Sequence, residues 1–359
     1  MRRLFLALTM VLVCPFALAK ESLRVFTWDG YVTPADVAAV NQVLTEKGYD
    51  IEVQVIAPYA TGPEQMFEII RSEKADVTFL TLNYIKMQNE RTSKLLQTIN
   101  TKSPRLGNYG KLRKELTALS MGMASDGPLY IPWGGGTYGI WANMKKLKKA
   151  ELPVTVGDLW DARWKGKISL SHGQIQPNIA LTLLALGKPP FLLNDLMVSN
   201  QRDQAFAVSD ELQGKVNRLY GQVARFWDAA PDYGDDLLLT ASYGIELARE
   251  NANGGKWELV KLKEGSTVWL DTINFTKGLT GKKLEAAEIF ANYFIGKDVQ
   301  TRVVKELSMV AVSHLANSNP IIEADPEFFA ERMFWPPYHQ EAADLMRRLS
   351  NKAMRAAAN

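Results

Sequence analysis

Two pairs of neighbouring aromatic and acidic residues could each help to bind an amine. Trp28 stands next to Asp29 in the segment VFTWDGYV, and Trp269 lies two residues before Asp271. Residues two apart on a strand face the same side, so we expect the second indole and carboxylate to share a face. An ammonium group can lie over an indole ring while it pairs with a carboxylate. The two pairs therefore predict a site for a cationic solute, with core packing as the alternative for each ring taken alone.

Polar and aromatic residues also lie where predicted strands end. Thr81, Asn83 and Tyr84 follow an apolar strand predicted for residues 75–80. In open α/β sheets, ligands bind outside the carboxyl ends of the strands. We therefore expect these three residues to face the same cleft as the first Trp–Asp pair. Five further residues are candidates for the lining of this cleft: Tyr31, Trp133, His172, Gln174 and Tyr243.

The sequence lacks the motifs of catalytic and metal-binding sites. His172, His314 and His339 are scattered and do not have the i, i+4 spacing of metal ligands on a helix. The chain has no G-x-S-x-G motif, and its single cysteine lies in a segment that we expect to be removed. The adjacent Asp235 and Asp236 cannot share a face of a strand, which argues against paired acid–base catalysis. We therefore expect neither an enzyme nor a bound metal or other cofactor.

Three consecutive glycines, Gly134 to Gly136, interrupt an aromatic and apolar stretch. Phosphate-binding loops place a lysine and a serine or threonine directly after their glycines. Here Thr137 follows, but the next lysine is Lys145, so we exclude nucleotide binding. Two interpretations remain: a tight turn, or a strand that crosses between two lobes and has to flex there.

The alternation of short apolar runs with amphipathic runs is typical of α/β proteins. Pro34 fits the first turn of a helix that we expect to end at Glu46. We predict strands at residues 23–27, 51–56, 75–80 and 167–170, one ending near residue 240, and two on either side of a turn at 264–265. We predict helices at residues 34–46, 64–72, 156–160, 179–186, 209–226, 284–295 and 298–307, one from about residue 243, and most of 327–355.

The composition and the amino terminus predict an exported protein of about two domains. Residues 1–19 join two arginines and an apolar run to the sequence Ala17-Leu18-Ala19, the pattern of a signal peptide cleaved after Ala19. Its removal leaves 40 of the 42 basic residues against 39 acidic ones, a balance that argues against binding to nucleic acid. No later apolar run is long enough to span a membrane. We therefore expect a periplasmic protein that is not embedded in the membrane.

Several ordered stretches resemble the periplasmic spermidine/putrescine-binding proteins of ABC importers. They cover nearly the whole chain after residue 19: FTWDGYV, KADVTFLTLNYIKM, YIPWGGGTYGIWANMKKL, VGDLWDARWKGKISL, GSTVWLDTINFTKG and GKDVQTRVV. The resemblance implies a two-lobed α/β fold with an interlobe ligand cleft and crossover hinge strands near residues 133–137 and 269–271. It implies one lobe of residues 20–135 plus 271–308 and a second of residues 136–270 plus 309–359. It also implies hinge closure on a polyamine and delivery to a membrane permease, and we expect a monomer.

The resemblance assigns roles to individual residues. Trp28 and Tyr31 match the W-x-x-Y of the family, and Asp29 lies one place before the usual carboxylate position. Asp271 matches the carboxylate that holds an amine, and Trp269 matches an aromatic residue that stacks on the methylene chain. Thr81 matches a small hydroxyl contact, whereas Asn83 stands where an aromatic residue is common.

One segment departs from the pattern of polyamine binders. Those proteins tend to carry acidic residues after the strand at 167–170, where this chain has His172, Gln174 and Gln176. An unpaired ammonium at that end would be costly, so a solute with one cationic end and a neutral or acidic other end fits equally well. Glu246 could supply the missing carboxylate. The alternatives are thus a binding protein for a zwitterion or polyol, and a periplasmic sensor subunit with the same fold.

Overall fold

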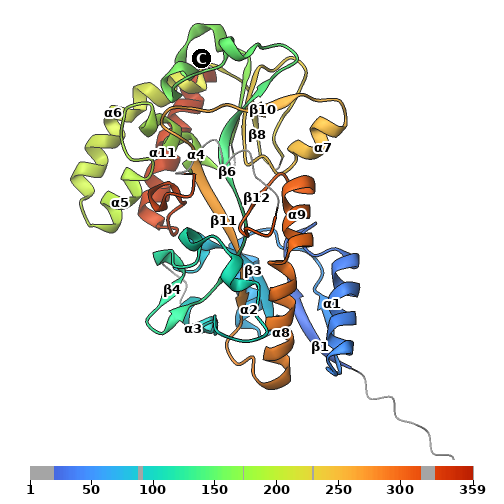
Figure 1. Ribbon diagram of the computed structural model, residues 1–359. Coiled ribbons are helices and arrows are strands. Elements are labelled where there is room, and N and C mark those ends of the chain that lie inside the picture. Colours follow the sequence, from blue (N-terminus) through green and yellow to red (C-terminus); the bar gives the residue numbers. More distant parts are fainter. Residues whose placement is uncertain (1–19, 88–91, 173, 229, 317–327, 359) are drawn as a thin grey trace, which may run out of the picture.

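The computed structural model describes residues 20–87, 92–172, 174–228, 230–316 and 328–358. It has a mixed α/β fold with a lower and an upper lobe, joined by two long strands (Figure 1). The fold class predicted from the sequence is confirmed. The predicted signal peptide, residues 1–19, lies outside the described residues.

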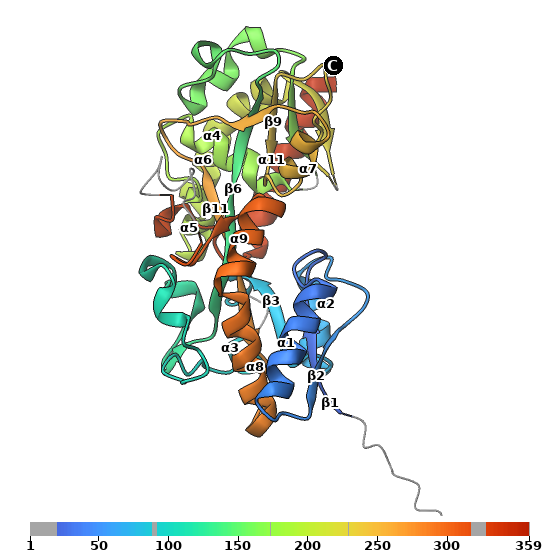
Figure 2. The ribbon, with the colours of Figure 1, turned by 45° about the vertical axis from the view of Figure 1, so that its right-hand side comes forward.

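The lower lobe is built on three parallel strands. β1 (Glu21–Phe26) lies between β2 (Ile51–Val55) and β3 (Val77–Thr81). The connecting helices are α1 (Pro34–Glu46) and α2 (Pro63–Arg71), and α8 (Gly281–Phe294) packs against α1 and β1 (Figure 2). The predicted bounds of α1 are confirmed, because Thr33 and Asp36 form a capping box ahead of Pro34.

The upper lobe repeats this arrangement with three more parallel strands. β7 (Ile168–Ser171) lies between β8 (Val223–Trp227) and β9 (Leu239–Ser242). The helix predicted for residues 209–226 is wrong beyond Tyr220, because Gly221 ends it and residues 223–227 turn back into the sheet as β8. Helices on this lobe are α4 (Ile175–Leu184), α5 (Leu192–Val198), α6 (Arg202–Tyr220), α7 (Leu247–Ala252) and α11 (Gln340–Ala358), with α11 against α4, α5 and α6 (Figure 1).

Two long antiparallel strands run between the lobes. β6 (Ile131–Asn143) pairs with β11 (Thr267–Phe275), which also pairs with β3 below, whereas β6 pairs with β9 above. The path through the sheet is therefore β2-β1-β3-β11-β6-β9-β7-β8. Two short strands outside this path, β10 (Trp257–Leu259) and β12 (Val310–Ala311), also pair with β6. Figure 2 shows β6 and β11 passing from one lobe to the other.

The three consecutive glycines lie inside β6, so the interpretation as a tight turn is wrong. They belong to a strand that pairs with both β11 and β9, and its flexing at this point stays a prediction. They leave room for large side chains of the neighbouring strand β11 and of the residue just before β12. A Cβ atom on Gly136 would lie 2.7 Å from the Trp269 indole, and one on Gly134 would lie 2.8 Å from Met309. The glycines therefore let the Trp269 ring lie flat on the backbone of β6.

The remaining elements are short. They are α3 (Thr92–Leu95), α9 (Lys297–Glu306), the two-stranded ribbon of β4 (Met123–Ala124) and β5 (Gly127–Pro128), and several 3-10 turns, among them Leu82–Tyr84, Val156–Trp160 and Glu331–Met333. Gln300 of α9 ties the crossing point together, since its amide donates to the Trp133 carbonyl at 2.8 Å and accepts from the Val312 N–H at 2.9 Å. The exact residues at which one lobe ends and the other begins remain a prediction.

Candidate functional site

A cavity of about 930 Å³ receives residues from both lobes and from β11. Its volume is in the range of small-molecule sites. Ten of the twelve residues predicted from the sequence line it: Trp28, Asp29, Tyr31, Thr81, Asn83, Tyr84, Gln174, Tyr243, Trp269 and Asp271. The other lining residues are Ala60, Pro63, Ile175, Gln176, Pro177, Ile245, Glu246, Trp335, Tyr338, Ala343, Met346 and Arg347.

Asp271 is the most buried acidic group of the cavity wall, with only 4% of its surface exposed. The Tyr31 hydroxyl donates a hydrogen bond to its Oδ2 atom, and its Oδ1 atom has no hydrogen-bond partner among the described residues. Burial raises the pKa of Asp271 to about 6, and the hydroxyl groups of Tyr31 and Thr81 oppose this rise only in part. This buried oxygen in the cavity wall, opposite Thr81 of β3, thus lacks a donor in hydrogen-bonding geometry.

Trp269 stands on the same face of β11, two residues before Asp271. Its ring rests on Gly136 and meets the Tyr243 ring edge-on, with 6.4 Å between ring centroids and 76° between planes. Its indole N–H has no partner among the described residues. The two-residue spacing in the sequence therefore predicted correctly that this indole and carboxylate line one cavity.

The loop after β1 forms the lower wall. The Trp28 indole donates to the carbonyl of Phe79 at 3.0 Å, which fixes its ring against the end of β3. Asp29 is exposed at the rim, and Gly30 adopts a φ of +76°, which turns the chain so that Tyr31 points inward. This turn explains why one short segment supplies three lining residues.

Two predicted site residues do not line the cavity. Trp133 is fully buried behind it and packs on Tyr31, with ring centroids 4.2 Å apart, so it supports the wall from within the core. His172 is half-exposed and pairs with Asp228 at 2.9 Å. Trp133 was a candidate as an aromatic residue and His172 as part of the segment after the strand at 167–170. The alternation of side chains along β6 sends Trp133 to the packed face.

The upper wall comes from the loop after β9 and from the start of α4. The Tyr243 hydroxyl donates to the side-chain oxygen of Gln174, which joins these two segments. Glu246, half-buried, follows on the same loop just before α7. Sequence reasoning considered Glu246 without being able to place it, because its direction depends on where the turn of residues 243–246 ends.

The carboxyl-terminal segment forms a wall that the sequence analysis missed. Trp335 and Tyr338 flank the Pro-Pro pair, and Met346 and Arg347 follow on α11. The Asn83 amide donates to the carbonyl of Pro336 at 3.4 Å and so connects this segment to the lower lobe. The cluster FWPPY at residues 334–338 was the available signal, but no strand end placed it near the cleft.

Acidic groups outnumber basic groups in the lining. Asp29, Glu246 and Asp271 are carboxylates, whereas Arg347 is the one basic residue among the described lining residues. Arg347 already pairs with Asp344 at 2.7 Å. The charge of the cavity therefore favours a cationic ligand.

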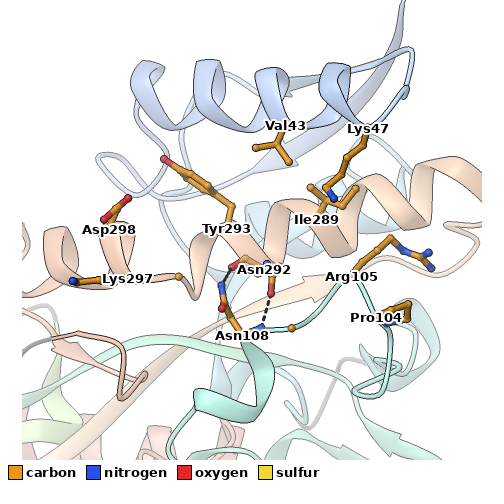
Figure 3. Close-up of a pocket in the computed structure, with 12 residues that line it drawn as sticks. Val43, Lys47, Pro104, Arg105, Asn108, Ile289, Asn292, Tyr293, Lys297 and Asp298 are labelled. Carbon is orange, nitrogen blue, oxygen red and sulfur yellow. Dashed lines mark hydrogen bonds between the residues drawn. The ribbon is translucent and has the colours of Figure 1, made fainter.

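A second cavity, of about 360 Å³, lies between α1, α8 and residues 104–108 (Figure 3). Several of the polar groups that line it are already paired. The Asn108 N–H donates to the Asn292 side-chain oxygen at 2.7 Å, and the Asn108 amide donates to the Asn292 carbonyl at 2.9 Å. The Arg105 guanidinium is held by Glu288 at 2.6 Å. We therefore assign this cavity no ligand.

Within the described part of the chain, no cluster of three His, Cys, Asp or Glu residues is arranged to hold a metal ion. The helices of that part include none with the length and apolar character of a membrane span.

The comparisons with known proteins find bacterial solute-binding proteins. The model of a family described as bacterial extracellular solute-binding protein matches residues 100–330. The spermidine/putrescine substrate-binding protein PotD from Streptococcus pneumoniae is 17% identical, with 93% of this chain and 99% of that chain covered and a TM-score of 0.67. The TpPotD lipoprotein of Treponema pallidum is 14% identical over 93% and 99% of the two chains, with a TM-score of 0.68.

A protein named for a different solute has a similar structure. The Atu4243-GABA receptor is 16% identical over 93% of this chain and 98% of that chain, with a TM-score of 0.63. No curated protein sequence matches the chain. At these identities the structural matches establish the shared fold.

Proposed function

Since the chain belongs to the bacterial extracellular solute-binding proteins, we propose that it captures a small amine-bearing, polyamine-like solute in the periplasm for an ABC importer. The resemblance found in the sequence is confirmed for this wider family. The observation that carries the proposal is the buried Asp271, whose Oδ1 atom lacks a donor beside the Trp269 ring in a cavity rich in carboxylates.

An ammonium group matches this arrangement better than other small polar groups. It would donate to the Oδ1 atom of Asp271 while its methylene chain lies on the Trp269 indole. A hydrogen bond between charged groups contributes roughly 1.5–3 kcal/mol. A positive charge at this position would also lower the pKa of Asp271 and offset the cost of burying its carboxylate.

Capture would proceed by closure of the two lobes. Trp28, Asp29 and Tyr31 come from the lower lobe, Gln174 and Tyr243 come from the upper lobe, and β11 carries Asp271 between them. A solute that contacts both lobes binds the closed form better than the open form and so shifts the population toward closure. The closed form would then be recognised by the membrane permease, with the binding protein acting as a non-enzymatic monomer.

A second candidate is a zwitterionic solute, with a carboxylate as well as an amine. The indole N–H groups of Trp269 and Trp335 have no acceptor among the described residues, and both rings line the cavity. A polyamine with all its amines protonated has no acceptor to offer them, whereas a carboxylate has several. The GABA receptor of similar fold is named for a solute of this kind.

A thermal-shift screen of residues 20–359 separates these candidates. The solutes would be putrescine, spermidine, agmatine, GABA, betaine and glucose, each added at several concentrations. A solute that binds the folded protein raises its melting temperature. We expect a rise with amines that disappears in Asp271→Asn and persists in Lys47→Ala, a variant in the second cavity. A rise with glucose or betaine and none with any amine would contradict the proposal.

A further inference from the structure

Arg302, on α9, holds the backbone of the turn that brings Tyr31 into the cavity. Its guanidinium donates to the Gly30 carbonyl at 3.2 Å and to the Tyr31 carbonyl at 2.9 Å. It also donates to the Asp36 carboxylate at 2.8 Å, and its side chain is only 14% exposed. A planar guanidinium has enough donors to make these three contacts at once. One side chain therefore joins α9 to the loop after β1 and to the first turn of α1.

The two carbonyls determine the direction of the Tyr31 side chain. They belong to the peptide units on either side of the Tyr31 Cα atom, and each unit is planar, so fixing both units fixes φ and ψ of Tyr31. The internal support of the turn is weak. Gly30 has a φ of +76°, and the hydrogen bond from the Tyr31 N–H to the Trp28 carbonyl is long, at 3.4 Å. The orientation of Tyr31 thus depends on Arg302.

The helix that carries Arg302 also supports the Tyr31 ring. Gln300 of α9 is fully buried and donates to the Trp133 carbonyl at 2.8 Å, which fixes the helix to the crossing strand β6 (Figure 2). The Trp133 ring packs on the Tyr31 ring, with 4.2 Å between their centroids. The backbone of Tyr31 is therefore held by Arg302 and its ring by Trp133, and its hydroxyl is directed to Asp271.

The Tyr31 hydroxyl decides which oxygen of Asp271 is left for a solute. It donates to Oδ2, whereas Oδ1 has no hydrogen-bond partner among the described residues. The hydrogen bond favours the ionised carboxylate and so lowers the pKa of Asp271 against the effect of burial. One contact thus both orients the carboxylate and helps to keep it charged.

We propose that Arg302 is a positioning residue, which holds the Tyr31 hydroxyl on one oxygen of Asp271 and leaves the other oxygen for the solute. The part of the solute in this role rests on the proposed function, but the positioning itself is measurable without any solute. A structural role alone would lower the stability of an Arg302 variant and leave the ionisation of Asp271 unchanged.

Thermal unfolding from pH 4 to pH 8 measures the ionisation of Asp271 in the wild type, Tyr31→Phe and Arg302→Met. Each protein is compared with its counterpart that also carries Asp271→Asn. The pKa of Asp271 is higher in the folded protein than in the unfolded chain, so the gain from Asp271→Asn grows with pH and levels off at the folded value. The neighbouring Tyr31 and Tyr84 stay neutral over this range, because burial raises the pKa of both, that of Tyr84 to about 12.

The gain should level off near pH 6 in the wild type. It should level off about one pH unit higher in Tyr31→Phe, which loses a hydrogen bond to the charged form. Arg302→Met should shift the levelling point in the same direction, because the Tyr31 hydroxyl is no longer held on Asp271. An unshifted levelling point in Arg302→Met would overturn the inference.

The double variant Tyr31→Phe/Arg302→Met separates positioning from a direct effect of the arginine charge. If Arg302 acts through Tyr31, Arg302→Met causes no further shift once Tyr31→Phe is present. A further shift of similar size would mean that the charge acts on Asp271 through space, and this result would also overturn the inference.

The matched control is Arg113→Met. The Arg113 side chain is 18% exposed and donates to the Ala311 carbonyl of β12 at 3.4 Å, rather than to the loop after β1. Its replacement should leave the levelling point at the value of the wild type, and an equal shift in this control would contradict the assigned role.

A conservative variant covers the case in which Arg302→Met does not fold. Arg302→Lys keeps a positive charge beside Asp36 but replaces the planar fork with a single ammonium, which cannot hold both carbonyls in the same way. It should give a smaller shift in the same direction. A folded Arg302→Lys with no shift would overturn the inference.

Calorimetric titration with putrescine at pH 6 connects this positioning to binding. Arg302→Met should bind roughly 3- to 10-fold more weakly than the wild type, because less of Asp271 is charged at this pH. Equal affinities would overturn the inference while amine binding stands. If the wild type bound none of the amines in the wider screen, the proposed function would fail, and the pH shift would still decide whether Arg302 positions Tyr31.

Discussion

Asp271→Asn should stabilise the ligand-free protein at neutral pH, although it removes the proposed contact with the ligand. The pKa of this buried carboxyl is raised from 3.8 to about 6. A difference of about two units corresponds to about 3 kcal/mol of free energy of unfolding. Asparagine has nearly the same shape and can still accept the hydrogen bond from Tyr31, so the variant avoids the cost of burying a charge.

The sign of the pH dependence follows from proton binding. Between pH 4 and pH 6 the folded protein holds a proton on Asp271 that the unfolded chain has lost, so the stability of the wild type falls as the pH rises through this window. The advantage of Asp271→Asn should therefore be absent near pH 4, grow up to about pH 6 and stay constant above it. A gain of 3 kcal/mol raises the melting temperature by several degrees.

Thermal unfolding of the two proteins at pH 4, 5, 6 and 7.5, without added solute, measures this difference. Asp29→Asn is the control, because Asp29 is exposed at the rim and its replacement should change the melting temperature little at any of these pH values. A difference between wild type and Asp271→Asn that does not vary with pH would refute the reasoning. A wild type that is more stable than the variant at pH 7.5 would refute it as well.

Two further predictions concern the same cavity. Gly136→Ala should lower the free energy of unfolding by about 1–3 kcal/mol and weaken solute binding, because its Cβ atom would lie 2.7 Å from the Trp269 indole. Urea unfolding would measure the stability and calorimetry would measure the binding. The control variant Gly110→Ala should be nearly neutral, because no atom lies within 4 Å of its Cβ. An unchanged stability of Gly136→Ala would contradict the close packing of the Trp269 ring on Gly136. Amine binding should weaken about tenfold for each pH unit below about 6, because protonation of Asp271 removes the charge that holds the ammonium. Calorimetry at pH 5 and 7.5 would measure this dependence, and equal affinities at the two values would argue against Asp271 as the anchoring group.

Local signals were sufficient for much of the fold. The bounds of α1 follow from Thr33, Pro34 and Asp36, which act within one helical turn. The helix predicted to reach residue 226 failed because the apolar spacing of Val216, Leu219 and Val223 continues past Gly221, where the chain changes from helix to strand. Periodicity alone does not register that change.

The sequence predicted those cavity residues whose positions follow from the geometry of a strand. The two-residue spacing of Trp269 and Asp271 and the strand-end position of Thr81 each place a side chain at the cleft. Trp335 and Tyr338 come from a segment more than 60 residues further along the chain, and their place depends on how α11 packs on the upper lobe. Such long-range contacts are a property of the assembled fold, and the aromatic cluster at residues 334–338 does not by itself indicate which surface it meets.

Calorimetric titration of residues 20–359 with putrescine at pH 7.5, in the wild type and in Asp271→Asn, tests the central claim most directly. The account predicts saturable binding by the wild type and a loss of at least tenfold in affinity in the variant. Equal affinities of the two proteins for putrescine would contradict it, because the amine would then be held by a group other than Asp271.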